Sequence, residues 1–375
     1  MGKGNAIRAL FLATATLLAA IYSSSLIAPA PAEATDRFVL KYACFAPEGS
    51  TYVRAMRAWD AELRERSDGR LSFKIYPGGV QGDERDMLRK VRVGQLHMVG
   101  MTGIGLGEVL PAFRILEMPA FYRNYEEVDA ATKAVEPALE ALVREQRYEL
   151  LGWGEAGTVH IFSNSPLSTL EDLSATKMWA WEGDRISTEL FKMFGIGPVP
   201  LPLPNVLSSL QAGTIDGVYG SPLAVVALQW SSHIKYMTSQ HLGRAMGGTV
   251  IDKRRFDAIP ADLQALLKET GQIYHAQIVE GARAENDRAI ATLKKQGVQS
   301  LEIQPAEWTR LEQGAGTVRQ TLTGDMWSQQ LLDTVESAVA TVRNTSSQPS
   351  PSAPAPETGS LGLTNASTQP TGAAP

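Results

Sequence analysis

The stretch LSFKIYPGGVQGDERDMLRKVRVGQLHMVGM, residues 71–101, decides the fold class. Its first six residues alternate apolar and polar side chains, which is typical of a strand with one buried face, and a Pro-Gly-Gly sequence ends them. A helix is predicted around residues 86–93 and stops at Gly94, and residues 96–101 return to a strand pattern. Strands that alternate with helices in this way predict an α/β layered fold with a largely parallel sheet.

The alternation of strands and helices continues on both sides of this stretch. Ser50 opens a helix before it, and a helical region lies between Glu127 and Gln146 after it. Further predicted strands are RFVLKYACF (37–45), YELLGWG (148–154), TVHIFSN (158–164) and TKMWAW (176–181). Residues 261–296 favour helix almost without interruption, about 50 Å at 1.5 Å per residue, so this helix is expected to bridge two lobes. A last amphipathic helix is predicted from Trp327 onward.

The two ends of the chain differ in composition from its middle. Lys3 and Arg8 precede a long apolar run, and the small residues after it predict a secretory signal peptide, residues 1–34, cleaved after Ala34. Serines interrupt the apolar run, which disfavours the alternative of an uncleaved membrane anchor. Residues 344–375 are rich in Ser, Pro, Thr, Ala and Gly, and this composition predicts a disordered tail.

The composition narrows the class of protein. A chain of 375 residues with 44% hydrophobic side chains suits two globular domains or one large one. The net charge is -5 and both signs are dispersed along the chain, whereas a nucleic-acid partner would require a basic stripe. Cys44 is the only cysteine, so no internal disulfide is possible.

No stretch has the residue spacing of a catalytic or metal site. The histidines are scattered, and neither an H-E-x-x-H motif nor a G-x-S-x-G motif occurs. The glycines of GMTGIGLGE, residues 100–108, match neither a dinucleotide motif nor a P-loop, and they indicate flexible backbone near a ligand or a tight loop. We therefore predict a protein that is not an enzyme and that needs no cofactor and no metal.

Several longer stretches occur in an order that is known from one protein family. They are LSFKIYPGGVQGDERDMLRKVRVGQLHMV (71–99), PAFRILEMPAFYRNYEEV (111–128), LSTLEDLSATKM (167–178), GIGPVPLPLPNVLSSLQAGTIDGVYGSP (195–222) and FDAIPADLQALL (256–267). Together they resemble the DctP-like solute-binding proteins of TRAP (tripartite ATP-independent periplasmic) transporters. The resemblance extends over about residues 37–320, and the spacing from DL-x-x-x-K to LQ-x-G-x-x-DG is its most specific part.

The resemblance implies a two-lobed periplasmic receptor with a ligand cleft between the lobes. Lobe I would comprise residues 37–156 and 246–284, and lobe II residues 157–245 and 285–343. Such a receptor captures a small molecule and delivers it to the membrane permease of the transporter. We expect it to be a monomer.

This sequence departs from the family at the positions that hold the ligand. The family's strand after DL-x-x-x-K carries an arginine that pairs with a substrate carboxylate, and the matching residue here is Trp179. A second basic position of the family matches Val159, and the polar pair before a proline is replaced by Tyr219, Gly220 and Ser221. The resemblance therefore implies an atypical, aromatic-lined pocket.

The candidate ligand-binding residues follow from this comparison and from the predicted strand ends. They are Trp179, Trp181, Tyr219, Ser221, Phe45, Glu84, Thr102, Trp230 and Arg185. For the tryptophans the competing interpretation is core packing, which we expect for Trp59 and Trp327. Carboxylates at a helix start, such as Glu84, can instead complement the helix dipole. Arg185 would act as a substitute cation, or it is a solvated arginine at a helix start.

Three functions remain open on the sequence alone. The first is a TRAP-type receptor for a neutral, aromatic or amphipathic molecule. The second is an organic-acid receptor that uses Arg185 or backbone amides at a helix N-terminus. The third is a ligand-sensing subunit without a transport role. A hydrolase on the same fold would lack its catalytic residues.

Overall fold

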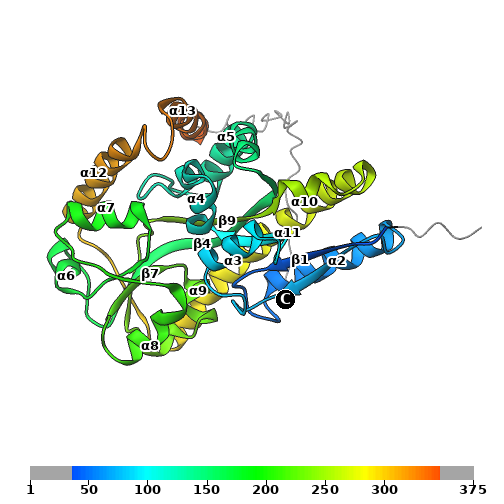
Figure 1. Cartoon of the computed structure of the whole chain (residues 1–375). Coiled ribbons are helices and arrows are strands. Elements are labelled where there is room, and N and C mark those ends of the chain that lie inside the picture. Colours follow the sequence, from blue (N-terminus) through cyan, green and yellow to red (C-terminus); the bar gives the residue numbers. More distant parts are fainter. Residues whose placement is uncertain (1–35, 347–375) are drawn as a thin grey trace, which may run out of the picture.

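The structure is a computed structural model that describes residues 36–346 (Figure 1). The predicted signal peptide, residues 1–34, lies outside the described residues. Residues 347–375 of the predicted tail also lie outside them. The preceding residues, 344–346, are the end of the last helix.

The strands form one central sheet and one small sheet. Their bounds are β1 (Phe38–Ala43), β2 (Leu71–Tyr76), β3 (Met98–Thr102), β4 (Tyr148–Ser163), β5 (Trp179–Trp181), β6 (Val199–Leu201), β7 (Gly217–Gly220), β8 (Tyr236–Thr238), β9 (Gly243–Asp252) and β10 (Gln299–Leu301). The central order is β10-β8-β4-β9-β3-β1-β2, with β7 as a further partner of β4, and β5 pairs with β6.

The central sheet is mixed, so the predicted largely parallel sheet is wrong. β1 runs parallel to β2 and β3, but β9 is antiparallel to both of its neighbours, β3 and β4. Strand β4 is also antiparallel to β7 and β8. The order of strands and helices along the chain predicts pairing only between strands that are close in sequence. Strand β9, however, lies between strands that are far from it in sequence.

Helices surround this sheet. Their bounds are α2 (Thr51–Arg66), α3 (Glu84–Arg92), α4 (Gly103–Val109), α5 (Tyr125–Glu145), α6 (Leu170–Ala175), α7 (Arg185–Met193), α8 (Val206–Gln211), α9 (Pro222–Ala227), α10 (Lys253–Asp257), α11 (Ala261–Lys295), α12 (Pro305–Leu322) and α13 (Gln329–Ser346), with 3-10 turns η1 (Pro111–Glu117), η2 (Leu203–Asn205) and η3 (Trp230–His233). The predicted N-cap of α2 is confirmed, because the Ser50 side chain accepts a hydrogen bond from the backbone N–H of Val53.

Strand β4 is one strand of 16 residues, where the sequence predicted two strands with a break between them. The register against β9 shifts between Leu150 and Gly152 and again between Glu155 and Gly157. Gly157 has a φ of 98°, which a glycine adopts without strain, so the second irregularity passes through the strand without ending it. The same strand therefore pairs first with β9 and then with β7 and β8.

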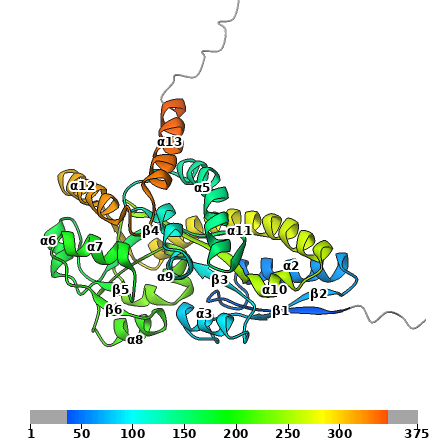
Figure 2. The ribbon, with the colours of Figure 1, turned by 45° about the horizontal axis from the view of Figure 1, so that its top comes forward.

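The long helix predicted over residues 261–296 is confirmed as α11, which has 35 residues. Figure 2 shows α11 extending along the molecule past α2. The indole N–H of Trp59 in α2 donates to Thr270 Oγ1 of α11 at 2.7 Å. Further along α11, Nδ1 of His275 donates to the backbone oxygen of Gly271, so its Nε2 accepts the hydroxyl of Thr249 in β9 at 2.7 Å. Helix α11 is therefore tied both to a helix and to the sheet.

The last helix packs on α5, beside which it lies in both views (Figures 1 and 2). Apolar side chains of the two helices, among them Val335 and Leu139, belong to one buried cluster, and Arg343 pairs with Glu127 at 2.9 Å. The contacts of α13 are thus with the part of the chain predicted as lobe I, and the lobe boundaries stay a prediction. Trp59 and Trp327 are buried as core residues, as expected, although Trp327 precedes α13.

Close packing of α11 against the sheet generates a stability prediction at Gly271. A Cβ on Gly271 would lie 2.7 Å from the backbone oxygen of Leu151 and 3.1 Å from Cζ2 of Trp59. We expect Gly271→Ala to lower the free energy of unfolding by about 1–3 kcal/mol, because this overpacking outweighs the gain in helix propensity.

Gly316 in α12 is the matched control for this substitution. The nearest atom to a Cβ there is 3.9 Å away, in the side chain of Arg319. Gly316→Ala should stabilise the protein by up to about 1 kcal/mol through propensity alone. Urea denaturation of both variants measures the difference, and equal signs for the two would contradict the packing described for Gly271.

Candidate functional site

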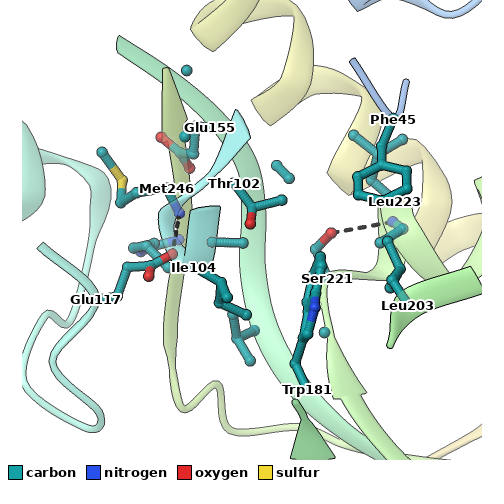
Figure 3. A pocket seen from close by; sticks show the side chains of 18 of the residues that line it. Phe45, Thr102, Ile104, Glu117, Glu155, Trp181, Leu203, Ser221, Leu223 and Met246 are labelled. Atoms are coloured by element: carbon teal, nitrogen blue, oxygen red, sulfur yellow. Dashed lines mark hydrogen bonds between the residues drawn. The ribbon is translucent and has the colours of Figure 1, made fainter. Parts of the chain in front are cut away.

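One large cavity opens beside the central sheet, with a volume of about 340 Å³. Its lining comes from the segment after β1, from β3 and α4, from β4, β5, α7 and β9, and from α11 (Figure 3). These segments belong to both of the predicted lobes. The volume is in the range of pockets that hold small organic molecules.

Aromatic rings form one wall of this cavity. Trp179 stacks on Tyr219 with ring centroids 5.3 Å apart and an angle of 21° between the planes. The Trp179 ring also meets Trp230 edge-on at 5.5 Å and lies 5.9 Å from Trp181. Its indole N–H donates to the backbone oxygen of Leu201 at 2.9 Å. With an exposed fraction of 2%, Trp179 is part of a buried cluster and lines the cavity as well.

Phe45 and Trp181 meet at the edge of the same wall. Their ring centroids are 6.3 Å apart and the planes form an angle of 66°, an edge-to-face contact. Phe45 follows β1, in predicted lobe I, whereas Trp181 ends β5, in predicted lobe II. This pair therefore brings together segments of the two predicted lobes, and both residues lie on the side of the cavity away from Glu155 and Met246 (Figure 3).

Of the nine candidate ligand-binding residues, only Arg185 does not line the cavity. The Arg185 guanidinium forms an ion pair with Asp325, and 48% of its side chain is exposed. This contact engages Arg185 outside the cavity lining, which leaves the organic-acid interpretation with backbone amides at a helix N-terminus as its anion contact. Ser221 lines the cavity and also caps α9, since its hydroxyl accepts from the backbone N–H of Ala224 at 3.1 Å.

Glu84 lines the cavity as a buried carboxyl group. Its Oε1 accepts the backbone N–H of Thr102 at 2.6 Å, and its Oε2 accepts the Thr102 hydroxyl at 2.8 Å. Burial raises the pKa of Glu84 to about 8. The hydrogen bonds from Thr102 lower this pKa, but they offset the effect of burial only in part. The group is therefore largely uncharged at neutral pH, although it is the first residue of α3.

A buried charge cluster that the sequence analysis missed lies beside the aromatic wall. Arg114 forms ion pairs with Glu117 at 2.5 Å and with Asp184 at 2.9 Å. Burial alone would raise the pKa of Asp184, but the Arg114 charge and hydrogen bonds from Tyr219 and Ser187 hold it below its usual value. The signal was present, because Arg114 interrupts the apolar segment PAFRILEMP.

Arg244 of β9 is a second buried arginine at the cavity, also missed in the sequence. Its guanidinium lies 4.0 Å from the ring centre of Tyr125. Burial lowers the pKa of Arg244, with nearby Tyr125 and Glu155 acting in the opposite direction. The sequence signal would have been an arginine in the otherwise uncharged run GRAMGGTV.

Residues 36–346 contain no group of three or more His, Cys, Asp or Glu side chains arranged to hold a metal ion. None of the helices described here is long and apolar enough to cross a membrane.

The raised pKa of Glu84 generates a prediction about stability and pH. The folded state keeps a proton on Glu84 that the unfolded chain releases near pH 4.5, so this stabilising term is complete below pH 4.5 and is lost as the pH rises to about 8. We expect Glu84→Gln to flatten the fall of unfolding free energy across this window, by at most ~1.4 kcal/mol per pH unit.

Glu182 supplies the matched control, because 58% of its side chain is exposed near the same rim. Glu182→Gln should leave the slope almost unchanged. Urea denaturation at several pH values between about 4.5 and 8 compares the wild type with both variants. An unchanged slope in Glu84→Gln would show that Glu84 is ionised throughout.

Comparison with known proteins identifies the family. The model of the family described as bacterial extracellular solute-binding protein, family 7 (DctP) matches residues 42–323. Among curated relatives, the 2,3-diketo-L-gulonate-binding periplasmic protein YiaO of Escherichia coli is 25% identical over 257 residues, covering 66% of this chain and 76% of YiaO.

Solved structures show the same fold. DctP7 of Bordetella pertussis, an extracytoplasmic solute receptor binding pyroglutamic acid, has a TM-score of 0.74 at 20% identity and covers 80% of this chain and 99% of its own. A TRAP periplasmic solute-binding protein of Citrobacter koseri with bound D-glucuronate has a TM-score of 0.72 at 24% identity, with coverages of 80% and 99%. The two-lobed α/β fold class predicted from the sequence is therefore confirmed. Since the family model spans most of the described chain, the protein belongs to family 7 of the bacterial extracellular solute-binding proteins, which are receptors for transport and not enzymes.

Proposed function

We propose that this protein is the periplasmic receptor of a TRAP transporter and that its ligand presents a ring or another apolar part to the aromatic wall of the cavity. The observation that carries the proposal is that Trp179 lies in a cluster of rings at the cavity. The sequence resemblance implies that this position corresponds to the family's carboxylate-binding arginine. A ring-lined wall favours ligands that have apolar or aromatic surface, because both burial and ring contacts contribute to their binding.

The relatives support a small organic ligand. YiaO is named for binding 2,3-diketo-L-gulonate, and the two solved receptors hold pyroglutamic acid and D-glucuronate. A cavity of about 340 Å³ suits molecules of that size or moderately larger ones. The ligand proposed for this chain differs from those of the relatives in having an apolar or aromatic part, which meets Trp181 and its neighbours.

The proposed ligand would hold the two lobes together. Residues 37–156 with 246–284 form lobe I in this proposal, and residues 157–245 with 285–343 form lobe II. The edge-to-face contact of Phe45 with Trp181 crosses between them at the cavity. A molecule bound beside these rings would add contacts to both lobes, and a permease of the TRAP type would then receive it from the closed receptor. Export through the predicted signal peptide belongs to the same proposal.

Identification of the natural ligand tests the proposal. The protein is purified without denaturation from the periplasm of its host, and the small molecules it releases are identified by mass spectrometry. We expect a molecule with an aromatic ring or a sizeable apolar body. A wholly hydrophilic ligand, such as an unsubstituted sugar acid, would contradict the proposed use of the aromatic wall.

The indole ring of Trp181 gives the corresponding mutational prediction. Trp181→Ala should weaken binding of the identified ligand by about 1–3 kcal/mol, because the ligand loses apolar area and ring contact. Isothermal titration calorimetry measures this change.

Trp59→Ala is the control for a tryptophan that serves the core alone. Trp59 of α2 is buried against α11 and does not line the cavity, and its loss should cost about 3–5 kcal/mol of stability. Trp181→Ala should cost less stability than Trp59→Ala and more affinity. If Trp181→Ala binds the ligand as tightly as the wild type, the aromatic wall does not contact it.

A further inference from the structure

Arg244 differs from the other buried arginine of the cavity in having no ionic partner. Its exposed fraction is 3%, yet Nε and Nη1 have no hydrogen-bond partner anywhere in residues 36–346. Arg114, by contrast, is held by both Glu117 and Asp184. Buried N–H groups that lack a hydrogen-bond acceptor are rare in folded proteins, so their presence at a cavity requires an explanation.

The nearest acidic side chains are already engaged by a second arginine. Arg283 binds Asp129 at 2.5 Å and Glu155 at 2.8 Å. Both guanidinium groups lie over the ring of Tyr125, Arg244 at 4.0 Å and Arg283 at 4.3 Å from its centre. Arg283 therefore engages both carboxylates, although its single charge does not neutralise the two, and Nε and Nη1 of Arg244 stay without a hydrogen-bond partner at the cavity lining.

The polar residues next to Arg244 contribute no additional charge. Thr158, which is opposite Arg244 in the β4–β9 register, bonds to His160 Nε2 at 2.9 Å. His160 Nδ1 lies 2.8 Å from the backbone oxygen of Thr238, and since a carbonyl only accepts, Nδ1 donates and Nε2 accepts. Burial lowers the pKa of His160 to about 4 and also lowers the pKa of His241, so both rings are neutral near pH 7.

Arg244 belongs to the side of the cavity that faces the aromatic wall. Figure 3 shows Glu155 and Met246 on one side of the pocket, with Phe45 and Trp181 on the other. Arg244 is two residues from Met246 on β9, and Glu155 pairs with Met246 in the register. The cavity thus has one end that holds the guanidinium of Arg244 and an aromatic end opposite it.

From this geometry we propose that Arg244 is the anion-binding residue of the cavity, so that the ligand is an amphipathic organic anion with its carboxylate at Arg244 and its apolar body against Trp181. The guanidinium suits this role because its planar donors match the two oxygens of a carboxylate. The inference rests on the proposed function, which assigns the aromatic end. It moves the anion contact from the strand of Trp179, where the family resemblance expects it, to strand β9.

A matched pair of probes tests the role of the charge. Indole-3-acetate and indole-3-acetamide have the same ring and nearly the same shape, but only the first is an anion. Calorimetric titration of the wild type is expected to show clearly tighter binding of the acid. Arg244→Gln should weaken binding of the acid about 30-fold or more while changing that of the amide little, so the ratio of the two affinities falls towards one.

Two further variants separate this role from a structural one. Arg244→Lys keeps the charge without the planar donors and should retain part of the preference for the acid. Arg283→Lys keeps the positive charge beside Asp129 and Glu155, outside the cavity lining, and should keep the acid-to-amide ratio even if it lowers thermal stability. An unchanged ratio in Arg244→Gln, or an equal loss of the ratio in Arg283→Lys, would overturn the assignment to Arg244.

Trp181→Ala measured with the same probes distinguishes this inference from the proposed function. It should weaken the acid and the amide by similar factors and leave their ratio unchanged. A ratio that depends on Arg244, with no effect of Trp181→Ala, would keep the anion site and overturn the aromatic wall. Weakening by Trp181→Ala with a ratio independent of Arg244 would do the reverse. No binding of either probe at millimolar concentration would overturn both.

Discussion

Continuous backbone hydrogen bonding along β4 is the constraint on which the cavity depends. The first part of the strand pairs with β9, and its last residues, from His160 to Ser163, pair with β7 and β8. One sheet therefore carries side chains of both predicted lobes. Helix α11 crosses the same strand so closely that only a glycine fits at position 271. The strand and the helix therefore connect the two walls of the cavity.

The charges around the cavity are arranged to limit the cost of burying them. Arg114 stands between two carboxylates, Arg283 holds two more at the opposite side, and Glu84 lowers its own cost by retaining a proton. Each of these two arginines is held by ion pairs within the protein. The guanidinium of Arg244 differs because its Nε and Nη1 have no hydrogen-bond partner in residues 36–346, so these donors are available to a ligand.

Local patterns predicted the elements whose signals lie within a short stretch of chain. The alternation in residues 71–76, the Ser50 cap and the uninterrupted helix of residues 261–295 all appear in the structure. The continuity of β4 was missed because the run EAG resembles a break, and only pairing with β9 sustains the strand through Gly157. Antiparallel insertion of β9 depends on contacts between distant segments, which periodicity does not report.

The candidate site was predictable where a family register fixed the position and otherwise was not. Trp179 and its ring partners were identified through the stretch after DL-x-x-x-K, and the structure brings them to one cavity. Arg114 and Arg244 were overlooked because each is a single charge within an apolar segment, without a spacing motif. Arg185 was included for its proximity in sequence to Trp179, but its side chain is directed to Asp325.

The contact between Phe45 and Trp181 has an optical consequence. Indole fluorescence shifts to longer wavelength when the ring moves from apolar surroundings into water, and Trp181 is shielded in part by Phe45, a ring from the other predicted lobe. Trp59, in contrast, is surrounded by side chains of a single core cluster and does not line the cavity. Emission from Trp181 would therefore report on the contact between the two predicted lobes in solution, without any attached dye.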